Sequence, residues 1–203
     1  MYAAEFSKPA VNVTVGVHVG DVFNYKLNGV SVLGPDATTP AYLADYNNTE
    51  IYQITITGVN GTEVSFITLW KFYNGTTVTL PQTLDIANGN KTDSNGFWAI
   101  YPANLKQSDL LRPKGFDGQR VNATDNVAYG SSSRHRDFWA IENQFFNVND
   151  PTHNTWSDDY VGVYFDQQTG MLTTLSHIQR FNNPQYNLII TWQLVNCTVW
   201  SVQ

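Results

Sequence analysis

Seven Asn-x-Ser/Thr tripeptides are the chemically most suggestive pattern in this 203-residue chain. The amide nitrogen of such an asparagine accepts N-linked glycans in secreted proteins. The asparagines are Asn12, Asn47, Asn60, Asn74, Asn90, Asn122 and Asn196. With 21 Asn and 32 Ser plus Thr, chance would give between three and four such tripeptides. We therefore predict N-glycosylation at these positions. The alternative is that Asn-Gly-Thr is simply favourable turn chemistry.

Six of the seven asparagines are expected to face solvent. They lie in Asn-Gly turns, in polar stretches, or on the polar face of an alternating N-terminal run. Asn196 is the exception, because strand alternation over residues 185–202 points it inward. An unbroken strand of that length would exceed about 50 Å, so we expect a bulge near Val195 that turns Asn196 outward.

No catalytic motif is evident, and we predict no catalytic residues. A glycosidase needs two facing carboxylates, and Glu63 and Glu142 lie in strand-like runs, but their spacing does not pair them. Residues 131–135 place serine hydroxyls near His135 in a loop, without a Gly-x-Ser-x-Gly motif. Cys197 is the single cysteine and is expected in the core, since it lies within a strand. A secreted carbohydrate-active enzyme using Glu63 or Glu142 stays an alternative.

Two oxygen-rich stretches, residues 85–95 and 147–159, contain the side chains that calcium prefers. Neither matches an EF-hand, and ordinary Asx turns explain the same composition. The four histidines are scattered, without the spacing of a zinc site. We predict no metal and no cofactor other than N-linked glycans, with calcium at these two stretches as the alternative.

Aromatic residues make up 14% of the chain. Trp98, Trp139 and Trp156 fall in its less regular half. Aromatic side chains can form sugar-binding platforms or protein interfaces, although core packing also requires them. A binding module for a glycan or an apolar ligand is therefore an alternative function.

Charged residues make up only 14% of the chain, and the net charge is −6 with 11 Lys plus Arg. This balance argues against a nucleic-acid partner. No run of 18 apolar residues predicts a transmembrane helix, and the first residues lack the features of a signal peptide. Asn and Thr supply the polarity that charge usually provides. We therefore predict an extracellular or cell-surface location, where attached sugars would assist solubility.

Alternating apolar residues predict a mostly β fold in one domain, residues 1–203: an antiparallel β-sandwich or open barrel with one short helix and long loops. The helix is predicted at Ala103–Leu111, and long loops at residues 85–96 and 112–135. The expected strands are residues 10–17, 21–27, 50–57, 62–73, 76–80, 137–146, 160–165, 171–181 and 185–202.

The N-terminal run presents Val11, Val13, Val15 and Val17 on one face. Such a strand has few charges to protect an exposed edge. Two interpretations stay open: it pairs within its own sheet, or residues 1–17 contain a strand donated to a neighbouring subunit. Head-to-tail donation of that kind builds filaments.

The segments Val19–Tyr25 and Asp166–Leu172 resemble the V-G-D-x-[FW]-x-Y opening and D-x-x-T-G-x-L hairpin of a loose group of archaeal secreted and cell-surface proteins. The resemblance implies a glycosylated β-domain of the kind that builds archaeal surface filaments through donated strands, and it implies no active site. We expect an extracellular structural protein that self-associates into a homopolymer.

Overall fold

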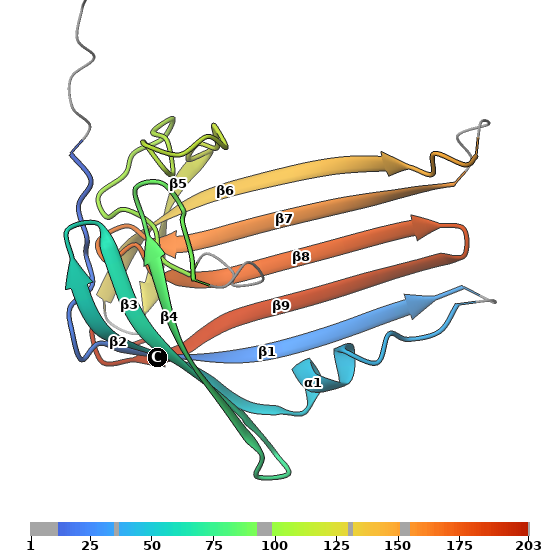
Figure 1. The fold of residues 1–203 in the computed structure, drawn as a ribbon, viewed down its shortest axis with the longest axis horizontal. Helices are drawn as coiled ribbons and strands as arrows, with labels where there is room; N and C mark the ends of the chain where they lie inside the picture. Colours follow the sequence, from blue (N-terminus) through green and yellow to red (C-terminus); the bar gives the residue numbers. More distant parts are fainter. Residues whose placement is uncertain (1–11, 35–36, 93–98, 130–131, 151–154, 203) are drawn as a thin grey trace, which may run out of the picture.

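The computed structural model describes residues 12–34, 37–92, 99–129, 132–150 and 155–202. Within these ranges the chain forms nine antiparallel strands in one sheet and a single short helix (Figure 1). The elements are β1 (Val22–Leu33), α1 (Leu43–Asn47), β2 (Thr49–Asn60), β3 (Glu63–Phe72), β4 (Thr77–Asp85), β5 (Ala123–Tyr129), β6 (Ser132–Phe146), β7 (Trp156–Asp166), β8 (Leu172–Asn182) and β9 (Gln185–Cys197). The prediction of a mostly β, antiparallel fold with one short helix is confirmed.

The strand order is β4-β3-β2-β1-β9-β8-β7-β6-β5. The first and last strands, β1 and β9, pair at the centre, from Phe23 opposite Cys197 to Leu33 opposite Tyr186. Every other pair joins strands that are consecutive in sequence. The sheet stays open, with β4 and β5 as its outer strands.

The core forms because the sheet curls over itself. Figure 1 shows β2, β3 and β4 crossing in front of one end of the long strands. One buried cluster accordingly unites Ile54 and Phe66 from the curled part with Trp139 and Phe165 from the long strands. Residues 99–121 add further buried side chains to the same cluster. The curled strands thus supply the second layer that an apolar sheet face requires.

The long strands continue past this core. At their far ends a single row crosses five strands in register: Leu33, Tyr186, Phe181, Ser157 and Phe145. We call these five residues the distal row. Its outer members remain accessible, with Leu33 42% and Phe145 54% exposed. Figure 1 shows this end of the sheet projecting away from the curled strands.

The predicted helix at Ala103–Leu111 is wrong. Asn104 and Ser108 have left-handed backbone angles, with φ of 61° and 74°. Their N–H groups donate to Gln167 O at 2.7 Å and to Val121 O at 2.8 Å, instead of to the preceding helical turn. Hydrogen bonds to distant segments therefore override the local helix preference.

Two other local predictions also fail. Of the predicted strand at residues 10–17, the described part makes one isolated bridge, between Thr14 and Ala103. The loop predicted at residues 112–135 contains β5 and the start of β6, which form a hairpin. The helix is instead α1, a five-residue element that the sequence analysis did not indicate.

The bulge expected near Val195 is confirmed. Asn24 pairs with Asn196 and Tyr25 with Leu194, so Val195 is an extra residue in β9. Asn196 is consequently exposed, where its side-chain oxygen accepts a hydrogen bond from Asn24.

A buried ion pair anchors the β7–β8 hairpin. Asp166 has 0% exposure. It accepts hydrogen bonds from Arg134 Nε at 2.6 Å and Nη2 at 2.9 Å, and from the Thr169 backbone and hydroxyl at 2.8 Å each. The Arg134 guanidinium also lies 4.3 Å from the ring centroid of Trp200. The pair therefore joins β6 and the hairpin to the C-terminal segment.

Glycines allow other segments to approach this hairpin closely. A Cβ on Gly170, where φ is 73°, would lie 1.9 Å from the carbonyl oxygen of Tyr101. A Cβ on Gly16 would lie 2.2 Å from the carbonyl oxygen of Gln168. The N-terminal segment and residues near Tyr101 thus both pack against the β7–β8 turn.

We predict that Arg134→Met lowers the free energy of unfolding by about 3–5 kcal/mol, because the Asp166 carboxylate loses its buried partner. Lys71→Met is the control, since the Lys71–Glu50 pair is exposed at 40% and 41% and should contribute at most about 1 kcal/mol. Urea unfolding measures both changes, and equal effects would contradict the anchoring role.

Candidate functional site

All seven asparagines of the predicted glycosylation sites are exposed. They lie at turns, at strand ends and in connecting segments of the curled part and its surroundings. The positions are Asn12 before β1, Asn47 in α1, Asn60 at the end of β2, Asn74 in the β3–β4 hairpin, Asn90 after β4, Asn122 before β5 and Asn196 in β9. Their exposure is compatible with modification, which stays a prediction.

Asn47 differs from the others because both the oxygen and the nitrogen of its side-chain amide are hydrogen-bonded to the backbone. Its Oδ1 accepts a hydrogen bond from Gly29 N at 2.9 Å, and its Nδ2 donates to Gly29 O at 2.7 Å. The hydroxyl of Thr49, the third residue of this tripeptide, donates to Asp45 O at 2.7 Å and accepts from Trp70 Nε1 at 2.6 Å. Both functional groups are therefore engaged in holding α1 against the sheet.

The distal row lies in a part of the chain without glycosylation tripeptides. Residues 123–195 contain eight of the 21 asparagines, yet none is followed by the required Ser or Thr. This stretch supplies four of the five distal-row residues. Within the row, Phe181 and Tyr186 stack with ring centroids 4.2 Å apart.

More apolar surface surrounds the distal row. Val148, just beyond β6, is 94% exposed, and Val32, which precedes Leu33 and points to the opposite face of the sheet, is 56% exposed. A hollow of about 200 Å³ opens beside Phe145 and Phe181, with Trp156 in its lining. The end of the sheet thus combines exposed apolar side chains with an absence of glycosylation tripeptides in the surrounding strands β6–β8.

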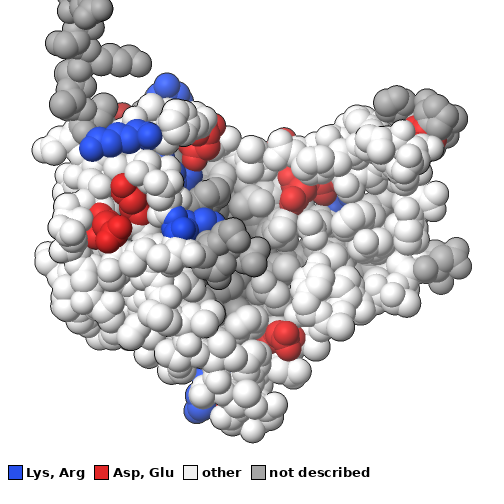
Figure 2. All heavy atoms as spheres, in the orientation of Figure 1, with Lys and Arg blue, Asp and Glu red and all other residues white. Residues whose placement is uncertain are grey.

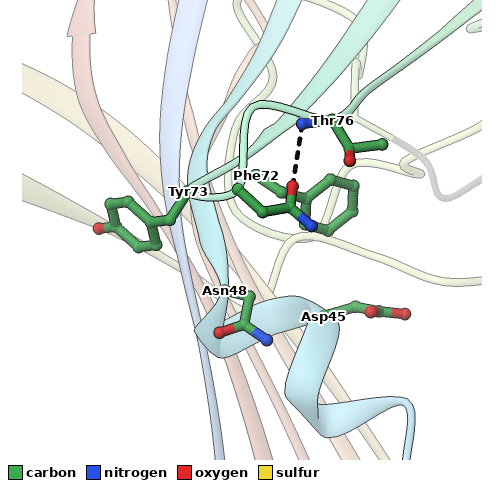
Figure 3. A pocket seen from close by; sticks show the side chains of 6 residues that line it. Asp45, Asn48, Phe72, Tyr73 and Thr76 are labelled. Atoms are coloured by element: carbon green, nitrogen blue, oxygen red, sulfur yellow. Dashed lines mark hydrogen bonds between the residues drawn. The ribbon is translucent and has the colours of Figure 1, made fainter.

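A larger hollow, of about 540 Å³, lies between α1 and the β3–β4 hairpin. Figure 3 shows Phe72, Tyr73 and Thr76 on the hairpin side, and Asp45 and Asn48 on the helix side. Among the residues that the structure describes, the lining consists of Asp45, Asn48, Phe72, Tyr73, Asn74 and Thr76. An aromatic ring next to carboxylate, amide and hydroxyl groups suits a carbohydrate, which presents both C–H faces and hydroxyls.

Packing behind this hollow fixes its aromatic wall. Phe72 stacks on Trp70 with centroids 5.0 Å apart and an interplanar angle of 29°. Trp70 in turn contacts Tyr46 and Tyr52 edge-on or tilted. Phe72 was not among the predicted site residues, although its position two residues before Asn74 in the sequence could have indicated it.

The two candidate catalytic carboxylates lie on different strands and have different partners. Glu63 belongs to β3 and Glu142 to β6, and five strands lie between these two in the sheet. Glu142 accepts a hydrogen bond from Arg180 at 3.3 Å, while Glu63 lies opposite Asp85.

The remaining possible nucleophiles are Cys197 and the serines that precede His135. Cys197 is half-buried, its Sγ donates to Trp200 O at 3.3 Å, and burial raises the pKa of its thiol, so it is a poor nucleophile. Of the serines before His135, Ser131 lies outside the described residues, whereas Ser133 and His135 are exposed on β6 and not in the predicted loop.

The oxygen-rich stretches form Asx turns where they are described. Asp85 accepts hydrogen bonds from Ala87 N at 2.9 Å and the Asn88 amide at 2.6 Å. In the second stretch, Asn147 accepts a hydrogen bond from Asn149 N at 2.9 Å. Asp93 and Asn95 lie outside the described residues. Among the residues described, no group of three or more His, Cys, Asp or Glu side chains is arranged to bind a metal ion.

The predicted tryptophan surface is divided. Trp139 is buried at 5% exposure, and Trp156 is half-buried beside the distal row. Trp98 lies outside the described residues. The three therefore do not provide one common platform within the described structure.

The valines proposed for strand donation contact their own chain. Val17 is 3% exposed, and Val13 and Val15 pack against the same core. Val11 lies outside the described residues. A potential acceptor is the outer strand β4, whose Val78 and Leu80 are 42% and 47% exposed. Donation of residues 12–17 would require them to leave their own core.

No protein-family model matches the chain, and a search of curated proteins finds no match. In the described part of the chain, no helix has the length and apolar character needed to span a membrane.

We predict that Asn47→Gln destabilises the protein even when no glycan is attached. The longer side chain cannot keep both hydrogen bonds to Gly29, and the expected cost is about 1–2 kcal/mol. Asn60→Gln, at an exposed hairpin position, should change stability by no more than about 0.5 kcal/mol. Chemical denaturation of protein from a host without N-glycosylation tests the difference, and similar losses would contradict the role assigned to Asn47.

Proposed function

We propose that the protein is an extracellular, N-glycosylated structural subunit that self-associates through its distal row into a filament or surface layer. One observation carries this proposal: the glycosylation tripeptides and most of the distal row lie in different parts of the chain. Exposed glycosylation tripeptides surround the curled core, whereas residues 123–195 have none and present most of the apolar distal row.

Low surface charge supports a role outside the cell in a close-packed assembly. Figure 2 shows charged side chains scattered over a face that is mostly uncharged. Such a surface avoids strong like-charge repulsion between copies. Attached sugars would supply the hydration that 14% charged residues do not.

The distal row supports association because exposed apolar groups gain free energy when they are covered. Its five residues come from five adjacent strands, so they form a continuous surface. A glycan on Asn47 would lie nearest to it, since Gly29 is only about 13 Å along β1 from Leu33. Because the Asn47 amide is hydrogen-bonded to Gly29, we expect Asn47 to carry no glycan.

Strand donation is the competing route to such an assembly, in place of contact through the distal row. The β4 edge would accept the strand, because residues 77–84 carry no charge that protects the edge. Pro81 removes one backbone donor there but leaves the preceding residues able to pair.

The double substitution Leu33→Ser and Phe145→Ser tests the distal row. We expect it to shift the native protein from polymer to monomer without unfolding it, as measured by sedimentation, electron microscopy and circular dichroism. Val78→Ser with Leu80→Ser is the matched control on a similarly exposed strand and should leave assembly intact.

If the β4 substitutions abolish assembly and the distal-row substitutions do not, the β4 edge is the contact between subunits. Loss of assembly after deletion of residues 1–11 would then support donation of that segment, since Val13, Val15 and Val17 pack against their own core. A wild-type protein that stays monomeric over the whole concentration range would contradict the proposed function, and so would a native protein in which every glycosylation tripeptide is unmodified.

A binding module for external glycans is the second candidate, and the hollow at Phe72 favours it. Titration of unglycosylated protein with free oligosaccharides, followed by tryptophan fluorescence, should show saturable binding if this candidate is correct. If tryptophan fluorescence does not change with oligosaccharide concentration, the protein is not such a binding module.

A further inference from the structure

We infer that the hollow between α1 and the β3–β4 hairpin is the seat of the first sugars of a glycan attached to Asn74. The glycan would then act as an internal brace between the hairpin and the helix. This inference rests on the proposed N-glycosylation and assigns one attached glycan a structural role.

The hairpin orients Asn74 for this arrangement. Asn74 Oδ1 accepts a hydrogen bond from Thr76 N at 2.9 Å, which fixes the amide and leaves Nδ2, the glycan-bearing atom, available. Asn74 also lines the hollow of about 540 Å³. This volume falls within the usual range of small-molecule pockets, about 300–1,000 Å³. A sugar on Nδ2 therefore begins at the rim of a space large enough to hold it.

Phe72 provides the surface for the sugar ring. It lies two residues before Asn74 and lines the same hollow. The turn is closed by hydrogen bonds from Phe72 N to Thr76 O at 3.0 Å and from Gly75 N to Phe72 O at 2.9 Å. Stacking on Trp70 holds the Phe72 ring in place. Because the ring is fixed before the sugar arrives, little conformational freedom is lost on contact.

The opposite wall comes from α1. Within the described structure, the side chains of Asp45 and Asn48 have no hydrogen-bond partner, so both are available to sugar hydroxyls. The helix has five residues and no side-chain N-cap, and a helix of this length is unstable without tertiary contacts. One such contact is the bond from Tyr73 N to Asn48 O at 2.9 Å. A sugar bridging Phe72 and Asp45 would add a second connection.

The β2–β3 hairpin provides an internal comparison. Asn60 is also exposed and also precedes a glycine, Gly61, with a positive φ of 60°. The residue two positions before it is Gly58, which offers no ring. A glycan on Asn60 therefore has no aromatic seat in its own hairpin and should not brace the fold.

The test compares Asn74→Gln and Asn60→Gln, each in the wild-type background and with Asp45→Ala or Phe72→Ala. Protein is made in a host that glycosylates Asn-x-Thr sites, with the same variants from a host that does not as the baseline. Glycopeptide mass spectrometry first establishes occupancy of both positions. Thermal unfolding and hydrogen exchange over residues 43–49 are then measured.

We expect loss of the Asn74 glycan to lower the midpoint of unfolding by about 2–4 °C and to speed exchange in α1. Either background substitution should reduce this glycan-dependent difference by half or more. Asp45→Ala is an exposed change that leaves the fold intact even if Phe72→Ala does not. Asn60→Gln should change neither measurement.

The outcomes separate the two proposals. If none of the sites is occupied in the native host, the proposed function fails. If Asn74 is bare while other sites are occupied, or if its glycan stabilises all backgrounds equally, only the brace is overturned. Saturable binding of free oligosaccharide to the hollow of native, Asn74-glycosylated protein would also overturn it, because an attached sugar would then not occupy the space.

Discussion

The structure depends on one constraint: a single sheet with a five-residue helix must supply most of its own second layer. The strands β2–β4 meet this constraint by curling over one end of the long strands, and the β7–β8 hairpin secures that end. The Arg134–Asp166 pair and the close approaches at Gly16 and Gly170 all lie there. The curl does not reach the other end, and for this reason the distal row stays exposed.

This division gives the two ends of the molecule different surfaces. Around the curled end, polar turns expose asparagines that could carry sugars. At the far end, large apolar or aromatic residues from four strands and Ser157 from a fifth lie in one row. A glycan at Asn74 would add structure to the first end, whereas a neighbouring subunit would cover the second. The low charge of the chain is compatible with both roles because close packing then meets little repulsion.

The sequence predicted those features that depend on local alternation. It indicated most strands, the open antiparallel class and the bulge at Val195, since a strand over residues 185–202 would be too long and would bury Asn196. It did not predict the pairing of β1 with β9, which joins distant segments. The helix predicted at residues 103–111 was wrong for the same reason, because the N–H of Asn104 donates to the carbonyl oxygen of Gln167 in a distant segment. Likewise, the sequence does not show that the Asn47 amide makes two hydrogen bonds to Gly29. Phe72 becomes part of a candidate site only because the fold places α1 across the hollow from it.

Residue-resolved hydroxyl-radical labelling of native assemblies, compared with dissociated subunits, tests the central claim most directly. The account predicts strong protection of Leu33, Phe145 and Phe181 in the assembly, with labelling of Val78 and Leu80 unchanged. Protection confined to Val78 and Leu80, or equal labelling of the distal row in both states, would contradict it.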